Sequence, residues 1–170
     1  MKADVQTNRG VRQHERRTLV LCDVDNLLPC EPKLAVEADY ERTVTQLVAE
    51  VDLRQTDQVV VGVSSRPTAA FGVRRAMPSS VLRVRRGIDG ADQALSEEVI
   101  DLRDVARRHD TVVIGSGDHY FVPTVVALNE AGIRTVVVSR PESLSRELAS
   151  VAQEVRLLTD ATNDQFVVVA

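Results

Sequence analysis

The amino-acid sequence predicts an α/β domain built as a three-layer sandwich, in which helices cover both faces of a mainly parallel central sheet. Strand-like and helix-like segments alternate along the chain, which is the pattern of βαβ units. Hydrophobic residues make up 44% of the sequence but aromatic residues only 3%, so the core must be aliphatic. Runs rich in Val suit parallel strands that are buried on both faces. The length of 170 residues favours one compact domain.

Six apolar runs, most of them rich in Val, are predicted to form the strands of this sheet. Short apolar runs that end at polar residues, Gly or Pro are typical of buried strands. The run at 81–85 is weaker and is expected near an edge, and a further run at 166–169 could add an edge strand. The six strands are expected at residues 18–22, 58–63, 81–85, 111–114, 135–139 and 154–158.

Five helices are predicted between these strands. In the first, Val44, Leu47 and Val51 recur at helical spacing. Pro67 suits an early position of the second helix, and Gly132 ends the fourth. The helices are expected at residues 34–51, 67–76, 91–108, 121–131 and 143–151.

One domain is expected at residues 18–158, with a tail on each side. Residues 1–17 carry several arginines and no hydrophobic periodicity, which indicates a flexible basic tail or a basic arm that touches nucleic acid. Residues 159–170 are interpreted as a C-terminal tail or the extra edge strand. No apolar run approaches the ~18 residues of a membrane-spanning helix, and the first residues lack the apolar stretch of a signal peptide.

Composition limits the classes of function. Cys22 and Cys30 lack the spacing of metal ligands and are interpreted as reduced thiols, which favours the cytoplasm. The net charge of −4 argues against a strong non-specific binder of nucleic acid, but not against a nuclease, because acids that hold metal ions also lower the net charge. No Gly-x-Gly-x-x-Gly follows the first strand, which disfavours a nucleotide-dependent Rossmann enzyme.

Three aspartates are expected to meet at the carboxyl edge of the sheet, where open α/β sheets bind ligands. Asp23 ends the first strand, and Asp118 follows the strand at 111–114 after a Gly-Ser-Gly turn. Asp92 lies three residues before Leu95, so it continues the inward-facing apolar stripe of the predicted helix 91–108 toward its start. That stripe is Leu95, Val99, Leu102 and Ala106.

These carboxylates, with Asp89 or Asp25 nearby, could form one acidic pocket. Carboxylates packed together repel one another, and a bound cation relieves the repulsion. An all-oxygen set of ligands suits Mg²⁺ or Mn²⁺, which can promote displacement at a phosphodiester. Structural roles stay open for several of these residues: Asp118 could cap the following helix, Asp89 could shape its turn, and Asn26 could brace the loop after the first strand.

Three motifs make the sequence resemble the NYN family, a group of PIN-like nuclease domains. They are Asp23-Val24-Asp25-Asn26, Gly90-Ala91-Asp92-Gln93-Ala94-Leu95 and Ser116-Gly117-Asp118-His119-Tyr120-Phe121, and the similarity spans roughly residues 19–158.

The NYN resemblance implies a PIN-like fold and the activity of a metal-dependent endoribonuclease that cuts RNA with Mg²⁺ or Mn²⁺. It assigns the catalytic and metal-binding carboxylates to Asp23, Asp92 and Asp118. The supporting residues are expected to be Asn26, Asp89, Asp25 and Ser116. The expected substrate is single-stranded RNA, and a homodimer is left open. The resemblance also has a departure: family members often carry a second Asp at the position of Tyr120, so catalysis here could be weakened.

Two alternatives remain. The stretch around Asp23 also resembles the first motif of haloacid-dehalogenase-like phosphatases, with Asp23 as nucleophile, Asp25 as acid/base and Ser64 as phosphate ligand. Neither Lys2 nor Lys33 sits where that fold needs its lysine.

The other alternative is a catalytically weakened RNA-binding or protein-interaction module of the same fold. In that case Arg83, Arg85 and Arg86 are candidates for binding RNA phosphates beside the acidic pocket.

Overall fold

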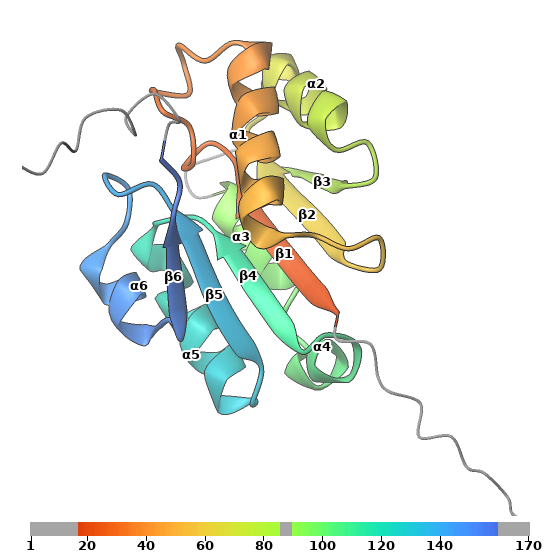
Figure 1. Cartoon of the computed structure of the whole chain (residues 1–170), viewed down its shortest axis with the longest axis vertical. Helices are drawn as coiled ribbons and strands as arrows, with labels where there is room; N and C mark the ends of the chain where they lie inside the picture. Colours follow the sequence, from red (N-terminus) through yellow and green to blue (C-terminus); the bar gives the residue numbers. More distant parts are fainter. Residues whose placement is uncertain (1–16, 86–89, 160–170) are drawn as a thin grey trace, which may run out of the picture.

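The computed structural model describes residues 17–85 and 90–159, and it shows one sheet of six parallel strands (Figure 1). The strand order is β3-β2-β1-β4-β5-β6, and every neighbouring pair is parallel. The α/β fold class is therefore confirmed, and the sheet is entirely parallel. The strands are β1 Thr18–Asp23, β2 Gln58–Val63, β3 Val81–Val84, β4 Thr111–Gly115, β5 Arg134–Ser139 and β6 Glu154–Leu157.

Helices cover both faces of the sheet, as a three-layer arrangement requires. Two helices, α1 and α2, pack together on one face, and four lie toward the other face (Figure 1). A short 3₁₀ turn, η1, leads into α5. The bounds are α1 Glu37–Val51, α2 Pro67–Ala76, α3 Gly90–Glu97, α4 Leu102–Arg108, η1 His119–Phe121, α5 Val122–Glu130 and α6 Arg146–Val151.

Alternation along β1 divides the core into two apolar clusters. Val20 and Cys22 belong to the cluster under α1 and α2, whereas Leu19 and Leu21 belong to the cluster under α3 and α5. Successive side chains of a strand point to opposite faces of a sheet. Asp23, the next residue after Cys22, is therefore expected on the face that α3 covers.

The predicted long helix at 91–108 is wrong, because the chain forms two helices there. The Asp101 carboxylate caps α4 by accepting hydrogen bonds from the backbone N–H groups of Arg103 and Asp104, both at 3.1 Å. The break also shifts the buried stripe, so that Val105 is buried and Ala106 is exposed. Aspartate at such a position favours a new helix start over continuation of the previous helix.

Replacing Asp101 with Ala is expected to lower the free energy of unfolding by about 1 kcal/mol, because two backbone N–H groups of α4 lose their acceptor. Urea denaturation monitored by circular dichroism measures this change. Asp101→Asn, which keeps an acceptor oxygen, should recover most of the loss, and equal stability of Asp101→Ala and the natural protein would show that the cap contributes nothing.

The other boundaries agree closely with the sequence, and some expectations lie outside the described residues. The helix predicted at 67–76 has the same bounds in the structure. The helix predicted at 143–151 begins only at Arg146, because Ser145 caps its start. Asp89, Arg86, residues 1–16 and 160–170 of the two tails, and with them the possible strand at 166–169, lie outside the described residues. Within residues 17–85 and 90–159, none of the helices is long and apolar enough to cross a membrane.

Candidate active site

The candidate site lies at the carboxyl ends of β1 and β4, where the order of strands reverses direction. The chain progresses from β1 to β2 and β3 on one side, and from β4 to β5 and β6 on the other. Such a switch point leaves a crevice beyond the strand ends in open α/β sheets. Asp23 is the last residue of β1, and Ser116, Gly117 and Asp118 follow β4 directly.

Two buried aspartates, Asp23 from β1 and Asp92 from α3, form the centre of the site. Their exposed fractions are 6% and 5%, and their carboxyl groups share a hydrogen bond. Burial raises the pKa of Asp23 well above its ordinary value, and the charge and hydrogen bond of Asp92 and the charge of Asp25 raise it further. The hydrogen bond from the backbone N–H of Asn26 opposes this rise.

A close approach of α3 to the sheet brings these two carboxyl groups together. Gly62 of β2 pairs with Asp23 of β1. A Cβ atom at Gly62 would lie 3.1 Å from the Cβ of Ala91 and 3.0 Å from the Cδ1 of Leu95. The missing side chain therefore lets the first turn of α3, with Asp92, pack directly against the end of β1.

The raised pKa of Asp23 predicts an unusual pH dependence of stability in the protein without divalent cations. The folded state holds a proton at Asp23 that the unfolded chain releases near pH 3.8. The contribution of Asp23 to stability is thus fully present below this value, and it is lost as the pH rises toward the raised pKa of the folded state. Urea denaturation in EDTA between pH 4 and pH 8 measures the effect, and Asp23→Asn should remove this part of the pH dependence.

Asn26 links three loops at the carboxyl edge. Its backbone N–H donates to Asp23 Oδ1 at 3.5 Å, and its side-chain Oδ1 accepts from the Gly117 N–H at 2.8 Å. The Ser143 hydroxyl donates to the Asn26 carbonyl oxygen at 3.2 Å. The loops that follow β1, β4 and β5 are therefore joined at one asparagine, next to the carboxyl pair.

Asp118 lies on the loop after β4 and caps η1. Its Oδ1 accepts a hydrogen bond from the Tyr120 N–H at 2.9 Å and lies 3.0 Å from His119 Nδ1. The Ser116 hydroxyl oxygen accepts from the Asp118 N–H at 3.2 Å. Within residues 17–85 and 90–159, no three Asp, Glu, His or Cys side chains are grouped closely enough to hold a metal ion. The structure thus joins Asp23 and Asp92, while the metal-binding role of Asp118 remains a prediction.

Asp25 faces structural partners on neighbouring elements. Its Oδ1 accepts from the hydroxyl of the buried Tyr40 at 2.9 Å, and its Oδ2 accepts from the Ser64 N–H at 3.0 Å. Burial of the Tyr40 hydroxyl, together with the charge of Asp25 and the hydrogen bond between them, raises the pKa of Tyr40 to about 12. Asp25 therefore ties the loop after β1 to α1 and to the end of β2.

Comparison with known families identifies the domain. The sequence profile of the NYN domain matches residues 17–159. The chain belongs to the NYN domain family. This is a PIN-like nuclease family, and its match covers every element of the sheet.

The fold of this NYN domain also occurs in a solved structure. A crystal structure of a protein of unknown function from Vibrio parahaemolyticus has a TM-score of 0.65 and 19% sequence identity, covering 87% of this chain and 96% of that one. At this identity the similarity shows the fold alone. No curated protein matches the chain.

Sequence reasoning missed Arg140, which follows β5 in this NYN domain. Arg140 is 3% exposed, and its Nε donates to the Leu27 carbonyl oxygen at 2.6 Å. Its guanidinium also reaches Gln46 Oε1 on α1 at 3.3 Å. Arg140 therefore fixes the first part of the loop that follows Asp23. The only signal in the sequence is an arginine placed directly after a buried, valine-rich strand.

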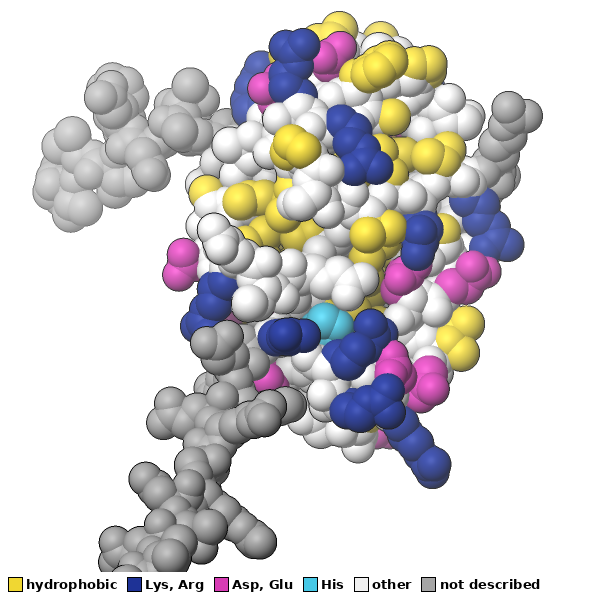
Figure 2. Space-filling view, turned by 90° about the vertical axis from the view of Figure 1, so that its right-hand side faces the viewer, with side chains coloured by type: hydrophobic (Ala, Val, Ile, Leu, Met, Phe, Trp, Pro, Cys, Tyr) yellow, Lys and Arg dark blue, Asp and Glu magenta, His cyan; other side chains and the backbone are white. Residues whose placement is uncertain are grey.

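The arginines expected to bind RNA phosphates are largely compensated by acidic side chains. Arg83 Nε lies 2.5 Å from Glu98 Oε1, and an Arg85 guanidinium nitrogen lies 2.6 Å from Glu97 Oε1. Figure 2 shows the side of the molecule on which β3 lies, where basic side chains alternate with acidic and hydrophobic ones. Their RNA-binding role remains a prediction, to which these ion pairs lend no support, and Arg86 lies outside the described residues.

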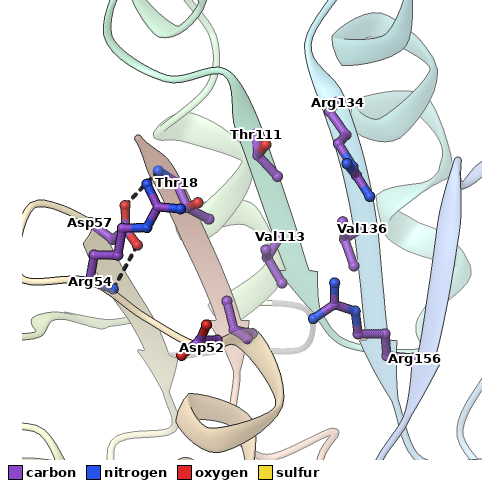
Figure 3. A pocket seen from close by; sticks show the side chains of 10 residues that line it. Thr18, Asp52, Arg54, Asp57, Thr111, Val113, Arg134, Val136 and Arg156 are labelled. Atoms are coloured by element: carbon purple, nitrogen blue, oxygen red, sulfur yellow. Dashed lines mark hydrogen bonds between the residues drawn. The ribbon is translucent and has the colours of Figure 1, made fainter. Parts of the chain in front are cut away.

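A separate pocket of about 420 Å³ lies at the amino ends of β1, β4 and β5, away from the carboxyl pair (Figure 3). Its lining includes Arg54, Arg134 and Arg156. Arg134 and Arg156 both bind Glu154, and Arg156 also donates to a carbonyl oxygen of α1. Both arginines thus already have partners, although they share a single carboxylate, and no ligand is assigned to this pocket.

Proposed function

We propose that this NYN domain is an endoribonuclease that hydrolyses phosphodiester bonds of single-stranded RNA with Mg²⁺ or Mn²⁺. The observation that carries the proposal is the buried pair of carboxyl groups of Asp23 and Asp92 at the switch point of the sheet. Two buried acids in contact are costly when both are ionised, and a divalent cation between them offsets this cost. The family match supports nuclease chemistry over the phosphatase alternative.

The residues present have the chemistry of a hard cation site. Asp23 and Asp92 would supply carboxylate oxygens, which Mg²⁺ and Mn²⁺ prefer. Asp118 is the proposed third ligand, because both of its contacts in the described part of the chain use Oδ1 and leave Oδ2 available. When bound, the ion would lower the pKa of a coordinated water and offset charge that develops on the phosphate.

The surrounding residues have positioning roles in this proposal. Asn26 holds Asp23 through its backbone N–H and holds the loop of Asp118 through Gly117. Asp25 fixes the neighbouring backbone through Tyr40 and Ser64 rather than binding the ion. Ser116 braces the turn before Asp118. Asp89 is retained as a supporting residue from the sequence alone.

The compartment is also part of the proposal. In the described residues Cys30 is an exposed free thiol and Cys22 a buried one. Free thiols are typical of the reducing cytoplasm, which we propose as the location.

A second candidate function is a catalytically weakened RNA-binding module of the same fold. Two observations favour it: Tyr120 stands where family members often carry an Asp, and Asp118 Oδ1 is engaged in capping η1. The two functions make different predictions for the same protein.

Mn²⁺ binding, measured by electron paramagnetic resonance, separates the candidates when combined with an RNA cleavage assay. The endoribonuclease proposal predicts saturable Mn²⁺ binding that weakens at least about tenfold in both Asp23→Asn and Asp118→Asn, together with cleavage. Mn²⁺ or RNA binding without cleavage would support the weakened module. Release of phosphate from small phosphomonoesters would instead support a phosphatase.

A further inference from the structure

Most basic side chains in the described part of the chain are already bound to an acidic side chain or to a carbonyl oxygen. The guanidinium groups that make no ion pair or hydrogen bond within residues 17–85 and 90–159 belong to Arg17, Arg54, Arg66, Arg103 and Arg146. Their positions divide into two groups. Arg17, Arg54 and Arg103 lie toward the amino ends of the strands, whereas Arg66 and Arg146 follow the carboxyl ends of β2 and β5.

Arg66 lies on the β2 side of the carboxyl pair. It is exposed and stands at the start of α2, two residues after Ser64, whose N–H binds Asp25. Its charge acts on the Tyr40 hydroxyl, which donates to the same Asp25 carboxylate. Arg66 therefore lies close enough to interact electrostatically with the Tyr40 hydroxyl, which is bound to Asp25 in the loop after Asp23.

Arg146 lies on the other side, next to the loop of Asp118. It is exposed and is the first residue of α6. The preceding residue, Ser145, donates its backbone N–H to the Gly117 carbonyl oxygen at 2.8 Å. The start of α6 is thus fixed against the turn that leads to Asp118.

We propose that Arg66 and Arg146 bind RNA phosphates on the two sides of the carboxyl pair. The RNA would then cross the carboxyl edge of the sheet from the end of β2 to the end of β5. This inference rests on the proposed function and names its substrate-binding residues. A polyanion is repelled by Asp23, Asp25, Asp92 and Asp118, so it needs cations beside them to bind. Arginine forks bind phosphate oxygens well, and these two make no ion pair with any described residue that would have to break first. Arg83 and Arg85, in contrast, would have to leave Glu98 and Glu97.

The test measures binding of a fluorescently labelled, uridine-rich single-stranded RNA to the full chain by anisotropy. The Asp23→Asn variant serves as parent in EDTA, so that cleavage cannot interfere. Arg66→Ala and Arg146→Ala should each weaken binding by about 3- to 10-fold and reduce the slope of log K against log salt concentration by about 0.7. Arg54→Ala and Arg103→Ala are matched controls, because they remove unpaired arginines from the opposite end of the sheet, and they should bind like the parent.

The inference is overturned if Arg66→Ala and Arg146→Ala bind RNA as tightly as the parent, or if Arg54→Ala weakens binding as much as they do. Arg66→Lys and Arg146→Lys should retain most of the affinity of the parent, which a purely structural role of the arginines would not explain. The outcome is separable from the proposed function. If Arg66→Ala and Arg146→Ala weaken RNA binding but the natural protein never cleaves RNA, this inference is supported and the proposed catalysis is contradicted. If the natural protein cleaves RNA but neither substitution changes RNA binding, catalysis is supported and this inference is contradicted.

Discussion

Asp23→Asn is expected to abolish metal-dependent RNA cleavage and, in the absence of divalent ions, to make the protein more stable. Loss of one hydrogen-bond donor that stabilises a transition state typically costs about 10²–10³ in rate, and loss of a metal ligand is expected to cost at least as much because it also removes the ion. The opposite effect on stability follows from the buried contact with Asp92, which raises the pKa of Asp23. At a pH well above the ordinary pKa of aspartate, a neutral amide removes the cost of burying this ionisable group beside Asp92, and a gain of about 1–2 kcal/mol is expected.

Cleavage rates with Mn²⁺ and thermal unfolding in EDTA measure these two effects on the same preparations. Asp110→Asn is the matched control, because Asp110 is exposed and lies before β4, away from the carboxyl pair. It should leave the cleavage rate unchanged and should not raise the melting temperature. A lower melting temperature of Asp23→Asn in EDTA would show that the carboxyl pair stabilises the fold, and it would contradict a cation-binding role for the pair.

Gly117→Ala is expected to destabilise the protein strongly and to disrupt the site. A Cβ atom at this position would lie 2.2 Å from the Ser143 carbonyl oxygen and 2.4 Å from Ser139 Oγ. The clash would separate the loops after β4 and β5 and strain the hydrogen bond from Gly117 N–H to Asn26. Overpacking of this kind costs about 1–3 kcal/mol, and cleavage should fall further than stability alone explains because Asp118 moves with the loop.

Gly132→Ala provides the comparison for Gly117→Ala. Gly132 has a φ of 77°, which non-glycine residues adopt at a cost of about 1 kcal/mol, but nothing lies within 4 Å of its added Cβ. It should lower the free energy of unfolding in urea while leaving the cleavage rate unchanged at temperatures where the variant is folded. Equal effects of the two substitutions on cleavage would contradict a specific role for the Gly117 turn.

The sheet could be predicted from the sequence because its strands carry their signal locally. Runs such as 58–63 and 135–139 each contain three consecutive valines, which is typical of strands buried on both faces. The position of Asp23 at the end of β1 followed from the same pattern. The inward direction of Asp92 also followed, because the first turn of α3 keeps the helical phase up to Leu95.

Much of what could not be predicted depends on contacts between elements that are distant in the sequence. The ion pairs of Arg83 with Glu98 and of Arg85 with Glu97, at the end of α3, form only after β3 and α3 are packed. Arg140 bonds to Leu27 across more than one hundred residues. The break between α3 and α4 has a local cause, because Asp101 caps a new helix instead of continuing the previous one. The apolar stripe alone does not reveal this break.

The central proposal for this domain is that Asp23 and Asp92 hold a divalent ion that is used for RNA cleavage. The direct measurement is the rate of cleavage of an end-labelled single-stranded RNA in Mn²⁺, in EDTA, and in Mn²⁺ with Asp92→Asn. We predict cleavage by the natural protein in Mn²⁺, none in EDTA, and a loss of at least about 10²-fold in Asp92→Asn. Cleavage that continues unchanged in EDTA and in Asp92→Asn would contradict the claim.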